Sequence, residues 1–479
     1  MFKNYKPGKY TSYMLFFLPL FFSLFMYFSR EADTWFILSH GRYVLNHGIP
    51  YTEILSMHSG FNFVMQQWLT ATIFYAVYKY LGELGFYIFY LLLNVLITFL
   101  IYKLCMIISD KKIYVSTLVS VIIVLILQFN FIEVRPQLFS YSFLLISMIL
   151  LEKHYKDKDS KMIYFLPIIP MLIVNFHAAF WLMFIILCLP YLAEYLLTKD
   201  KRFFKILFLI IIGCLLSFIN PYGIDGIKYG FSSYGVGNTN NFIIEMMPFN
   251  LSNSLIKGEC YLFLGVFLIV NAIMMFSNKK NKFNIHMILL IYGFLFMGFL
   301  AFKNTGFYFL FGLPFLCKFI PIEDGKNEVF PVKTYIFLII ILLSVFCYRT
   351  YNGSYKLETK IEDVIEYLDE NANKDIVLFT DYLFGSYVEF YGYKPYIDTR
   401  AEVYLKKNNG KEDILVEYFN ILEGKVDIDK FLDKYNFDYV MVNKGENIYK
   451  HIKNDDDYEL VFKSKNKITF LFKRKYSQI

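Results

Sequence analysis

The polar residues best placed to do chemistry follow directly on the first apolar run, at about residues 11–29. The next stretch, 30–36 (READTWF), brings two carboxylates, Glu31 and Asp33, to the point where a helix leaves the membrane. Carboxylates so close to hydrocarbon are costly and tend to mark function, here as a general base or as ligands to a divalent ion. The alternative is a helix-end cluster, with Trp35 in the interfacial belt, the arginine snorkelling and the acids solvated.

A second group of polar residues stands at the ends of later apolar runs, on what we expect to be the same side of the membrane. Arg135 and Lys303 suit a phosphate held at the lipid surface by charge-assisted hydrogen bonds. His177 follows Asn175 at a helix break and could bind a phosphate or a sugar hydroxyl. Simpler interpretations are an interfacial anchor for Arg135, a satisfied core histidine and a snorkelling lysine. The predicted substrate-binding set, for lipid phosphate and sugar, is Arg135, His177, Asn175, Lys303, Trp35 and Glu245.

The composition identifies a polytopic α-helical membrane protein. Of the 479 residues, 57% are hydrophobic and 20% are aromatic, and several apolar runs approach the length that spans a bilayer. The net charge of +7 does not indicate nucleic acid binding, because the lysines cluster in short loops between apolar runs, where they set orientation. All six cysteines lie in or beside apolar segments, so neither a disulfide framework nor a cysteine metal cluster is expected in the tail.

The lysine-bearing loops predict about 11 transmembrane helices, with the N-terminus in the cytoplasm and the C-terminal tail outside. Residues 30–85 then form a large first extracytoplasmic loop, with helices at 33–47 and 64–81 lying at the membrane surface. If 64–81 crossed the membrane, the lysines at 153–161 would face outward. The expected spans are 11–29, 86–108, 113–130, 137–152, 162–176, 180–197, 204–219, 260–277, 285–300, 304–319 and 333–348.

Residues 351–479 change in composition and predict a small extracytoplasmic α/β domain, separate from the transmembrane domain at 1–350. Strands are expected at 375–380, 387–391 and 437–443 and in a hairpin of 458–464 and 468–474. A helix is expected at 428–435, and Gly385 and Gly392 are expected in turns. Asp398 and Arg400 either form an internal salt bridge that fixes a loop or help to hold an acceptor.

The order of these elements resembles the polyprenyl-phosphate-dependent glycosyltransferases of the GT-C superfamily. It resembles most closely uncharacterised bacterial GT-C-like membrane proteins. The motifs that carry the resemblance are Asp33-Thr34-Trp35, Arg135-Pro136-Gln137, Asn175-Phe176-His177, Asn220-Pro221-Tyr222-Gly223 and Asp398-Thr399-Arg400. The fourth motif is most simply a helix stop followed by a turn.

The resemblance implies an inverting or retaining transfer of a sugar from a polyprenyl-phosphate carrier to a glycan, lipid or protein acceptor of the cell envelope. It implies Asp33 as the loop acid and Glu31 as the second catalytic candidate, although the family often has an adjacent acidic pair and here Ala32 separates the two. Whether Mg²⁺ or Mn²⁺ is required stays open, with Asp33 or Glu31 as the ligand. The rival functions are a transporter or flippase of lipid-linked glycans and an envelope polysaccharide polymerase or ligase.

Overall fold

The structure is a computed structural model, and its chain forms two compact units. It describes residues 9–25, 31–128, 131–232, 246–253, 257–277, 283–320 and 358–475, with a few single positions at 243 and between 337 and 347. We call Met1–Phe28 with Glu83–Tyr351 the membrane unit, and Ser29–Gly82 with Asn352–Ile479 the loop–tail unit. The first loop therefore groups with the C-terminal tail, although more than 250 residues of sequence separate them.

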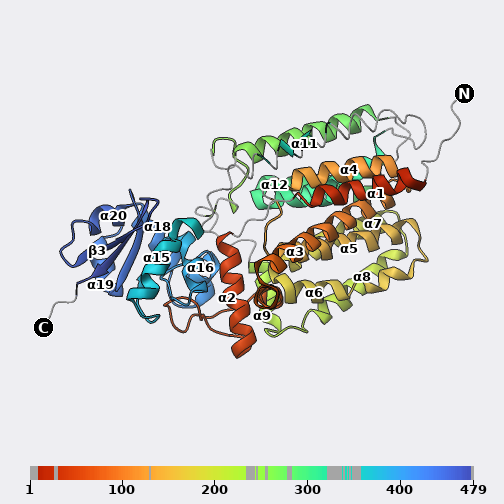
Figure 1. The fold of residues 1–479 in the computed structure, drawn as a ribbon. Helices are drawn as coiled ribbons and strands as arrows, with labels where there is room; N and C mark the ends of the chain where they lie inside the picture. The colour runs from red at the N-terminus through yellow and green to blue at the C-terminus, as the bar shows by residue number, and fades with distance from the viewer. Residues whose placement is uncertain are drawn as a thin grey trace, which may run out of the picture. The chain divides into compact units, whose positions relative to one another are not determined.

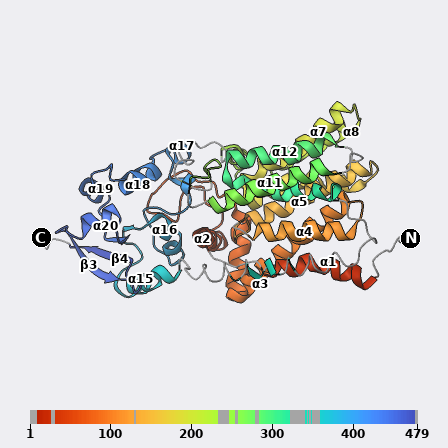
Figure 2. The same ribbon diagram turned by 90° about the horizontal axis from the view of Figure 1, so that it is seen from above.

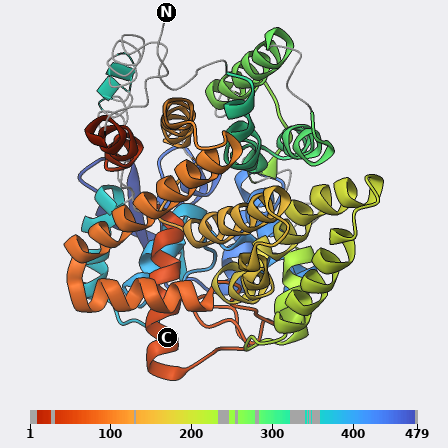
Figure 3. The same cartoon turned by 90° about the vertical axis from the view of Figure 1, so that its right-hand side faces the viewer.

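Long apolar helices run alongside one another in the membrane unit (Figures 1 and 2), and Figure 3 shows them turned toward the viewer. Trp68–Ile108, Lys161–Leu197 and Lys257–Phe276 are long and apolar enough to cross a membrane, and Ile113–Leu127 and Ile285–Leu300 are shorter apolar helices. The described helices are α1 (Lys9–Ser23), α3 (Trp68–Ile108), α4 (Ile113–Leu127), α5 (Gln137–Lys156), α6 (Ile168–His177), α7 (Trp181–Leu197), α8 (Arg202–Leu216), α9 (Ile224–Ser232), α11 (Lys257–Phe276) and α12 (Ile285–Leu300).

Two breaks divide long helical runs where the sequence predicts separate segments. Gly82 interrupts α3 with φ of 66° and ψ of −169°, a conformation that glycine adopts without steric cost. It separates a first part in the loop–tail unit from a second part in the membrane unit, as expected for 64–81 and 86–108. His177, with φ of −165° and ψ of 79°, separates α6 from the 3₁₀ turn η2 (Ala178–Phe180) and α7.

The span expected at 304–319 is helical, but it is built from a succession of short helical turns of different types. These are η4 (Phe302–Asn304), α13 (Thr305–Phe307), the π-helical turn η5 (Tyr308–Gly312) and the 3₁₀ helix η6 (Leu313–Lys318). Pro314 has no N–H to continue an α-helical ladder, and π turns accommodate such irregularities. The last expected span, 333–348, lies almost entirely outside the described residues.

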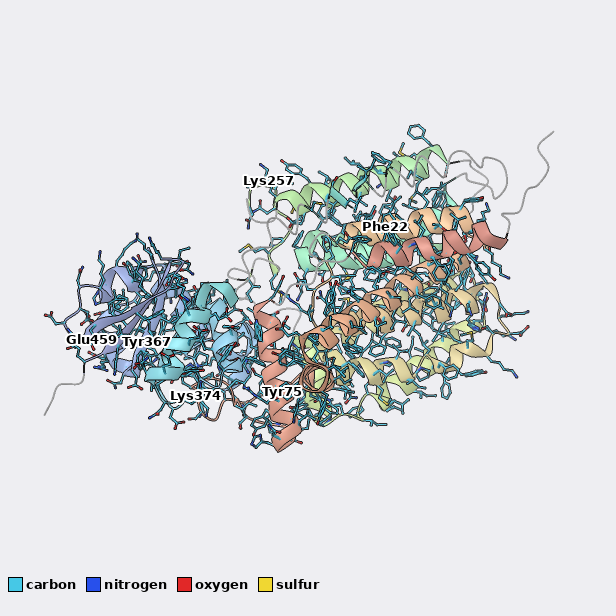
Figure 4. All side chains as sticks on the ribbon, in the orientation of Figure 1. Phe22, Tyr75, Lys257, Tyr367, Lys374 and Glu459 are labelled. Carbon is cyan, nitrogen blue, oxygen red and sulfur yellow. The ribbon has the colours of Figure 1, made fainter. Side chains whose placement is uncertain are left out.

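A buried polar cluster joins α5, α7 and α12. His286 has one ring nitrogen 3.2 Å from Glu152 Oε1 and the other 3.3 Å from Glu194 Oε2. Tyr191 donates to the same oxygen of Glu152 at 2.9 Å. Buried polar groups are stable only when paired, so this cluster fixes the three helices in register. At the other side of the bundle, α1 packs on α4, with Phe22 labelled in Figure 4 at this contact.

The loop–tail unit contains α2 (Ala32–His47), the first part of α3 and an α/β tail. The tail's four strands have the order β1-β2-β4-β3, with β1 parallel to β2 and the other pairs antiparallel. The tail elements are α15 (Glu358–Asn371), β1 (Leu378–Phe379), α16 (Tyr382–Phe390), η7 (Ala401–Tyr404), α17 (Lys406–Asn409), α18 (Ile414–Leu422), α19 (Ile428–Tyr435), β2 (Tyr439–Asn443), α20 (Asn447–Ile452), β3 (Tyr458–Lys463) and β4 (Thr469–Arg474).

Helices cover both faces of the tail sheet. Tyr367 of α15, labelled in Figure 4, stacks on Phe462 of β3, with ring centroids 4.9 Å apart. Tyr449 of α20 lies 4.9 Å from Phe470 of β4. Phe462 pairs with Leu471, the neighbour of Phe470, and successive strand residues point to opposite faces. The two helices therefore lie on opposite sides of the sheet.

The expected helix at 428–435 and the expected hairpin are confirmed, but the strand expected at 387–391 is wrong. That segment belongs to helix α16, which begins after Asp381, whose side chain accepts the backbone N–H of Leu383. Every residue from Phe384 to Glu389 is buried, so the helix shows no polar face that would distinguish it from a buried strand over a short window. Gly385 is therefore not a turn residue, whereas Gly392, with φ of 93°, is.

Candidate active site

The two candidate acids lie at the start of α2. Glu31 is the N-cap residue and Asp33 lies in the first turn, where the helix dipole favours a negative charge. Both side chains are half-buried, whereas Ala32 and all residues from Thr34 to Gly41 are buried. The acids are thus the accessible part of a helix segment that is otherwise enclosed.

Trp35 lies in the interior of the loop–tail unit, at 3% exposure. Its ring is 5.0 Å from that of Tyr387 and 4.8 Å from that of Phe390, both on α16. Figure 1 shows α2 and α16 side by side. The structure therefore gives Trp35 a packing contact with the tail, next to Asp33 in the chain.

Arg400 lies at the centre of a buried ion network in the loop–tail unit. Its guanidinium donates to both carboxylate oxygens of Glu53, at 2.8 and 2.9 Å. It also donates to Asp398 at 2.5 and 2.9 Å and to Glu389 at 3.1 Å. His40 of α2 completes the set, with Nε2 at 3.1 Å from Nη1. The salt bridge predicted between Asp398 and Arg400 is confirmed, and it extends to the loop through Glu53 and His40.

Only part of this network carries charge. Burial and the neighbouring Asp398 carboxylate raise the pKa of Glu389 well above its usual range. Burial would raise the pKa of Asp398 too, but the Arg400 guanidinium outweighs it and lowers that pKa to about 2. Burial and Arg400 lower the pKa of His40, which therefore stays neutral. The Arg400 guanidinium therefore faces a charged Asp398 carboxylate, while burial favours the protonated form of Glu389.

In the membrane unit, the structure brings Arg135, His177 and Lys303 together. Arg135 and Lys303 both lie within electrostatic reach of the His177 ring. Arg135 pairs with Glu133, with Nε 2.7 Å from the carboxylate. Arg135 and Lys303 are half-buried. These three residues form the basic cluster of the membrane unit.

Aromatic rings pack around the basic cluster. The Phe131 ring lies 6.2 Å from that of Phe302, which precedes Lys303 in the chain. Phe180 lies 4.4 Å from the His177 ring and 5.4 Å from Phe307. Aromatic faces suit both an apolar lipid chain and the apolar side of a sugar ring, so the surroundings match the proposed ligand classes.

His177 and Asn175 also have structural partners. His177 Nδ1 lies 3.0 Å from Ser140 Oγ on α5. Asn175 donates to the carbonyl of Met171, one turn earlier, and to that of Ile219, both at 2.8 Å. Asn175 therefore ties α6 to the segment after α8. The Asn220 side chain accepts from Tyr222 N–H and donates to Gly223 O in the turn between α8 and α9, as expected for a helix stop.

Two other residues considered from the sequence, Arg30 and Glu245, lie outside the described residues.

Among the described residues, one group of three side chains has ligand atoms close enough together to hold a metal ion. These are Asp429, His451 and Asp455 in the tail, whose ligand atoms all lie within 4.8 Å of one another. Mg²⁺ needs fewer protein ligands, since it is commonly held by one or two carboxylates together with substrate phosphates. Glu31 and Asp33 fit that simpler donor set.

The sequence pointed to the Asp398 and Arg400 motif but not to its partners. Glu53 lies in a polar loop and His40 in an amphipathic helix, and neither has a local signal of ion pairing. The one available hint is that His40 follows Asp33 by seven residues, two helical turns, and so lies on the same side of α2.

No protein-family model and no curated protein matches the sequence. Solved structures do match in fold. The Archaeoglobus fulgidus oligosaccharyltransferase tethered to an acceptor peptide matches with a TM-score of 0.62 at 10% identity, over 91% of this chain and 69% of that chain. AglB from the same organism, in complex with an inhibitory peptide and a dolichol-phosphate, matches with 0.61 at 9% identity over 91% and 69%. ArnT from Cupriavidus metallidurans bound to undecaprenyl phosphate matches with 0.55 at 10% identity, over 97% of each chain.

These matches cover most of the chain and include both units. The chain therefore shares its fold with the oligosaccharyltransferase AglB and with ArnT, and the fold that the sequence resemblance implied is confirmed.

Proposed function

We propose that this protein is a membrane glycosyltransferase that moves a sugar from a polyprenyl-phosphate carrier to a cell-envelope acceptor on the extracytoplasmic side. The observation that carries the proposal is the shared fold with AglB and ArnT, which extends over more than nine-tenths of this chain. Those proteins were solved with dolichol-phosphate and undecaprenyl phosphate. The half-buried acids of α2 and the basic cluster supply the two kinds of group that such a transfer needs.

In the proposed reaction, a hydroxyl of the acceptor attacks the anomeric carbon of the donor sugar. Asp33 takes the hydroxyl proton as a new carbon–oxygen bond forms. The bond between the anomeric carbon and the phosphate oxygen breaks, and its electron pair leaves with the lipid phosphate. Arg135 and Lys303 stabilise the charge that develops on that phosphate, by charge-assisted hydrogen bonds. His177 and the aromatic rings around it contact the sugar or the lipid.

A divalent ion, if the protein uses one, is held by Asp33 or Glu31 and would neutralise charge on the donor phosphate. Mg²⁺ and Mn²⁺ are the candidates.

The test is turnover of short-chain polyprenyl-phosphate sugars by purified protein, scored as free polyprenyl phosphate across a panel of acceptors, with and without divalent metal. We expect release that depends on an acceptor and that falls by about 10²- to 10⁴-fold in Asp33→Asn. Glu31→Gln is measured in parallel to separate the two acids. Asp157→Asn, at an exposed position after α5, is the matched control and retains turnover.

Two results would overturn parts of this proposal. Release that persists in Asp33→Asn but is lost in Glu31→Gln moves the base to Glu31. A donor that stays intact across the panel, while the protein moves it between membrane leaflets, replaces the transferase with a lipid-linked glycan transporter. Product length separates single transfer from polymerisation.

A further inference from the structure

The C-terminal tail contacts the acid-bearing helix at two places along its length. Near its start, Trp35 packs between Tyr387 and Phe390 of α16. Two turns after Asp33, the buried His40 side chain meets the Arg400 guanidinium. Contacts this far apart along one helix constrain both its position and its rotation.

Arg42 closes the contact between α2 and α16. Its guanidinium donates to the backbone carbonyls of Phe390 at 2.8 Å and Glu389 at 3.2 Å, in the last turn of α16. Carbonyls at a helix C-terminus lack partners within the helix and attract a cation. The same guanidinium lies 5.3 Å from the centre of the Phe390 ring, the ring that also packs on Trp35.

The other side of α2 is equally restrained. A Cβ atom at Gly41 would lie 2.0 Å from the carbonyl oxygen of Ala71 and 2.6 Å from the Cβ of Tyr75, on the first part of α3. Figure 4 shows Tyr75 beside α2. Helix α2 therefore packs against both α3 and α16.

The loop that follows α2 is bound to the tail as well. Glu53, besides holding Arg400, accepts the N–H groups of Leu55 and Ser56 at 2.7 and 2.9 Å, which fixes the loop around the carboxylate. His58 Nε2 lies 2.8 Å from the carbonyl oxygen of Tyr396. The first loop and the tail thus fold as one body, and the tail contributes the residues that determine where α2 lies.

We propose that Arg42 and Arg400 are positioning residues, through which the C-terminal tail holds α2 so that Asp33 is correctly placed for proton transfer. This proposal rests on the proposed function, because it assigns the tail a role in the same reaction. Displacing a reacting group by 1 Å can lower a reaction rate by about 10²-fold. Contacts that hold α2 at several points therefore keep Asp33 in the position that the reaction requires. We assign the donor phosphate to the basic cluster of the membrane unit, so the proposal gives neither arginine a role in donor binding.

The test is a set of variants of the full-length protein at Arg42, which is half-buried and replaceable with less risk to folding than Arg400. We expect Arg42→Ala to lower kcat by about 10- to 10²-fold. We expect KM for the short-chain donor to change by less than about twofold, since the loss of an interaction that acts only in the transition state lowers kcat and leaves KM unchanged. Arg42→Lys keeps a cation and a donor for the α16 carbonyls, and should recover part of kcat.

Arg474→Ala is the matched control. Arg474 is a partly buried arginine of β4 that bonds Asn436 and does not touch α2, so its loss weakens the tail without altering the helix contact. Amide hydrogen exchange of residues 32–47 is measured on every variant. We expect faster exchange there in Arg42→Ala and unchanged exchange in Arg474→Ala.

Equal losses of kcat in Arg42→Ala and Arg474→Ala would overturn the positioning role and leave only general stability. An unchanged kcat together with unchanged exchange in Arg42→Ala and Arg400→Lys would overturn it as well. Failure of the proposed function looks different: wild-type protein then releases no polyprenyl phosphate, while the exchange of α2 still responds to Arg42→Ala.

Discussion

Glutamate-to-glutamine changes at Glu53 and Glu389 should have opposite effects on stability, although both side chains contact the same guanidinium. Glu53 forms a two-point ion pair with Arg400. Glu53→Gln removes one of the two counter-charges and turns an amide NH₂ toward the cation. Removing one partner of a buried ion pair costs about 3–5 kcal/mol.

Glu389 is different because its folded-state pKa lies well above the ordinary value of 4.5. The native state then binds more protons than the unfolded state, so wild-type stability falls as pH rises from 4.5 toward the folded pKa. Over that range, each rise of one pH unit lowers the free energy of unfolding of the wild-type protein by about 1.4 kcal/mol. A glutamine at this position does not titrate, so the variant does not lose this stability. Glu389→Gln mimics the protonated acid and should be neutral below pH 4.5 and increasingly stabilising above it, relative to wild type.

The assay is thermal unfolding followed by tryptophan fluorescence, at pH values from 4 to 8. Trp35 and Trp68 belong to the loop–tail unit, and Trp35 packs directly on α16. The assay is run in a Trp181→Phe background, because Trp181 lies in the membrane unit and would add a signal from that unit. We expect a lower melting temperature for Glu53→Gln throughout. The difference between Glu389→Gln and wild type should grow as pH rises. If Glu389→Gln lowered the melting temperature as much as Glu53→Gln, both carboxylates would be charged. That result would refute the conclusion that Glu389 is protonated beside Arg400.

Three further predictions concern single residues. Lys303→Gln should raise KM for the donor by about 10-fold or more, as expected for loss of a charge-assisted hydrogen bond to phosphate, and steady-state kinetics measure it. Gly385→Ala should expose the loop–tail unit to limited proteolysis, because its Cβ would lie 1.9 Å from the carbonyl oxygen of Ile397; Gly258→Ala, with open space around it, should not. His286→Phe should destabilise the membrane unit by about 3–5 kcal/mol, because it leaves two buried carboxylates without their shared partner, and detergent unfolding curves measure the loss.

The local elements of this protein were largely predictable from its sequence. Apolar runs and flanking lysines indicate the membrane helices, and the alternation at 458–474 indicates the final hairpin. Helix α19 was expected with the bounds that the structure has. These features depend on neighbours in the chain, and so a short window contains the information. The segment 387–391 was misassigned because α16 is buried from Phe384 to Glu389, and four of its residues with the C-cap Tyr391 are too few to show a helical periodicity.

The residues of the candidate site were proposed from the sequence, whereas their partners were not. Placing a charged side chain near the membrane interior costs free energy, and this consideration alone draws attention to Asp33, Arg135 and Lys303. That the first loop belongs with the tail could not be inferred, because Glu53 and Arg400 are 347 residues apart and each is an ordinary charged residue in its own context. Only the tertiary structure places their side chains together in a buried setting, where an unpaired charge is too costly to persist and the pairing therefore determines how α2 is held.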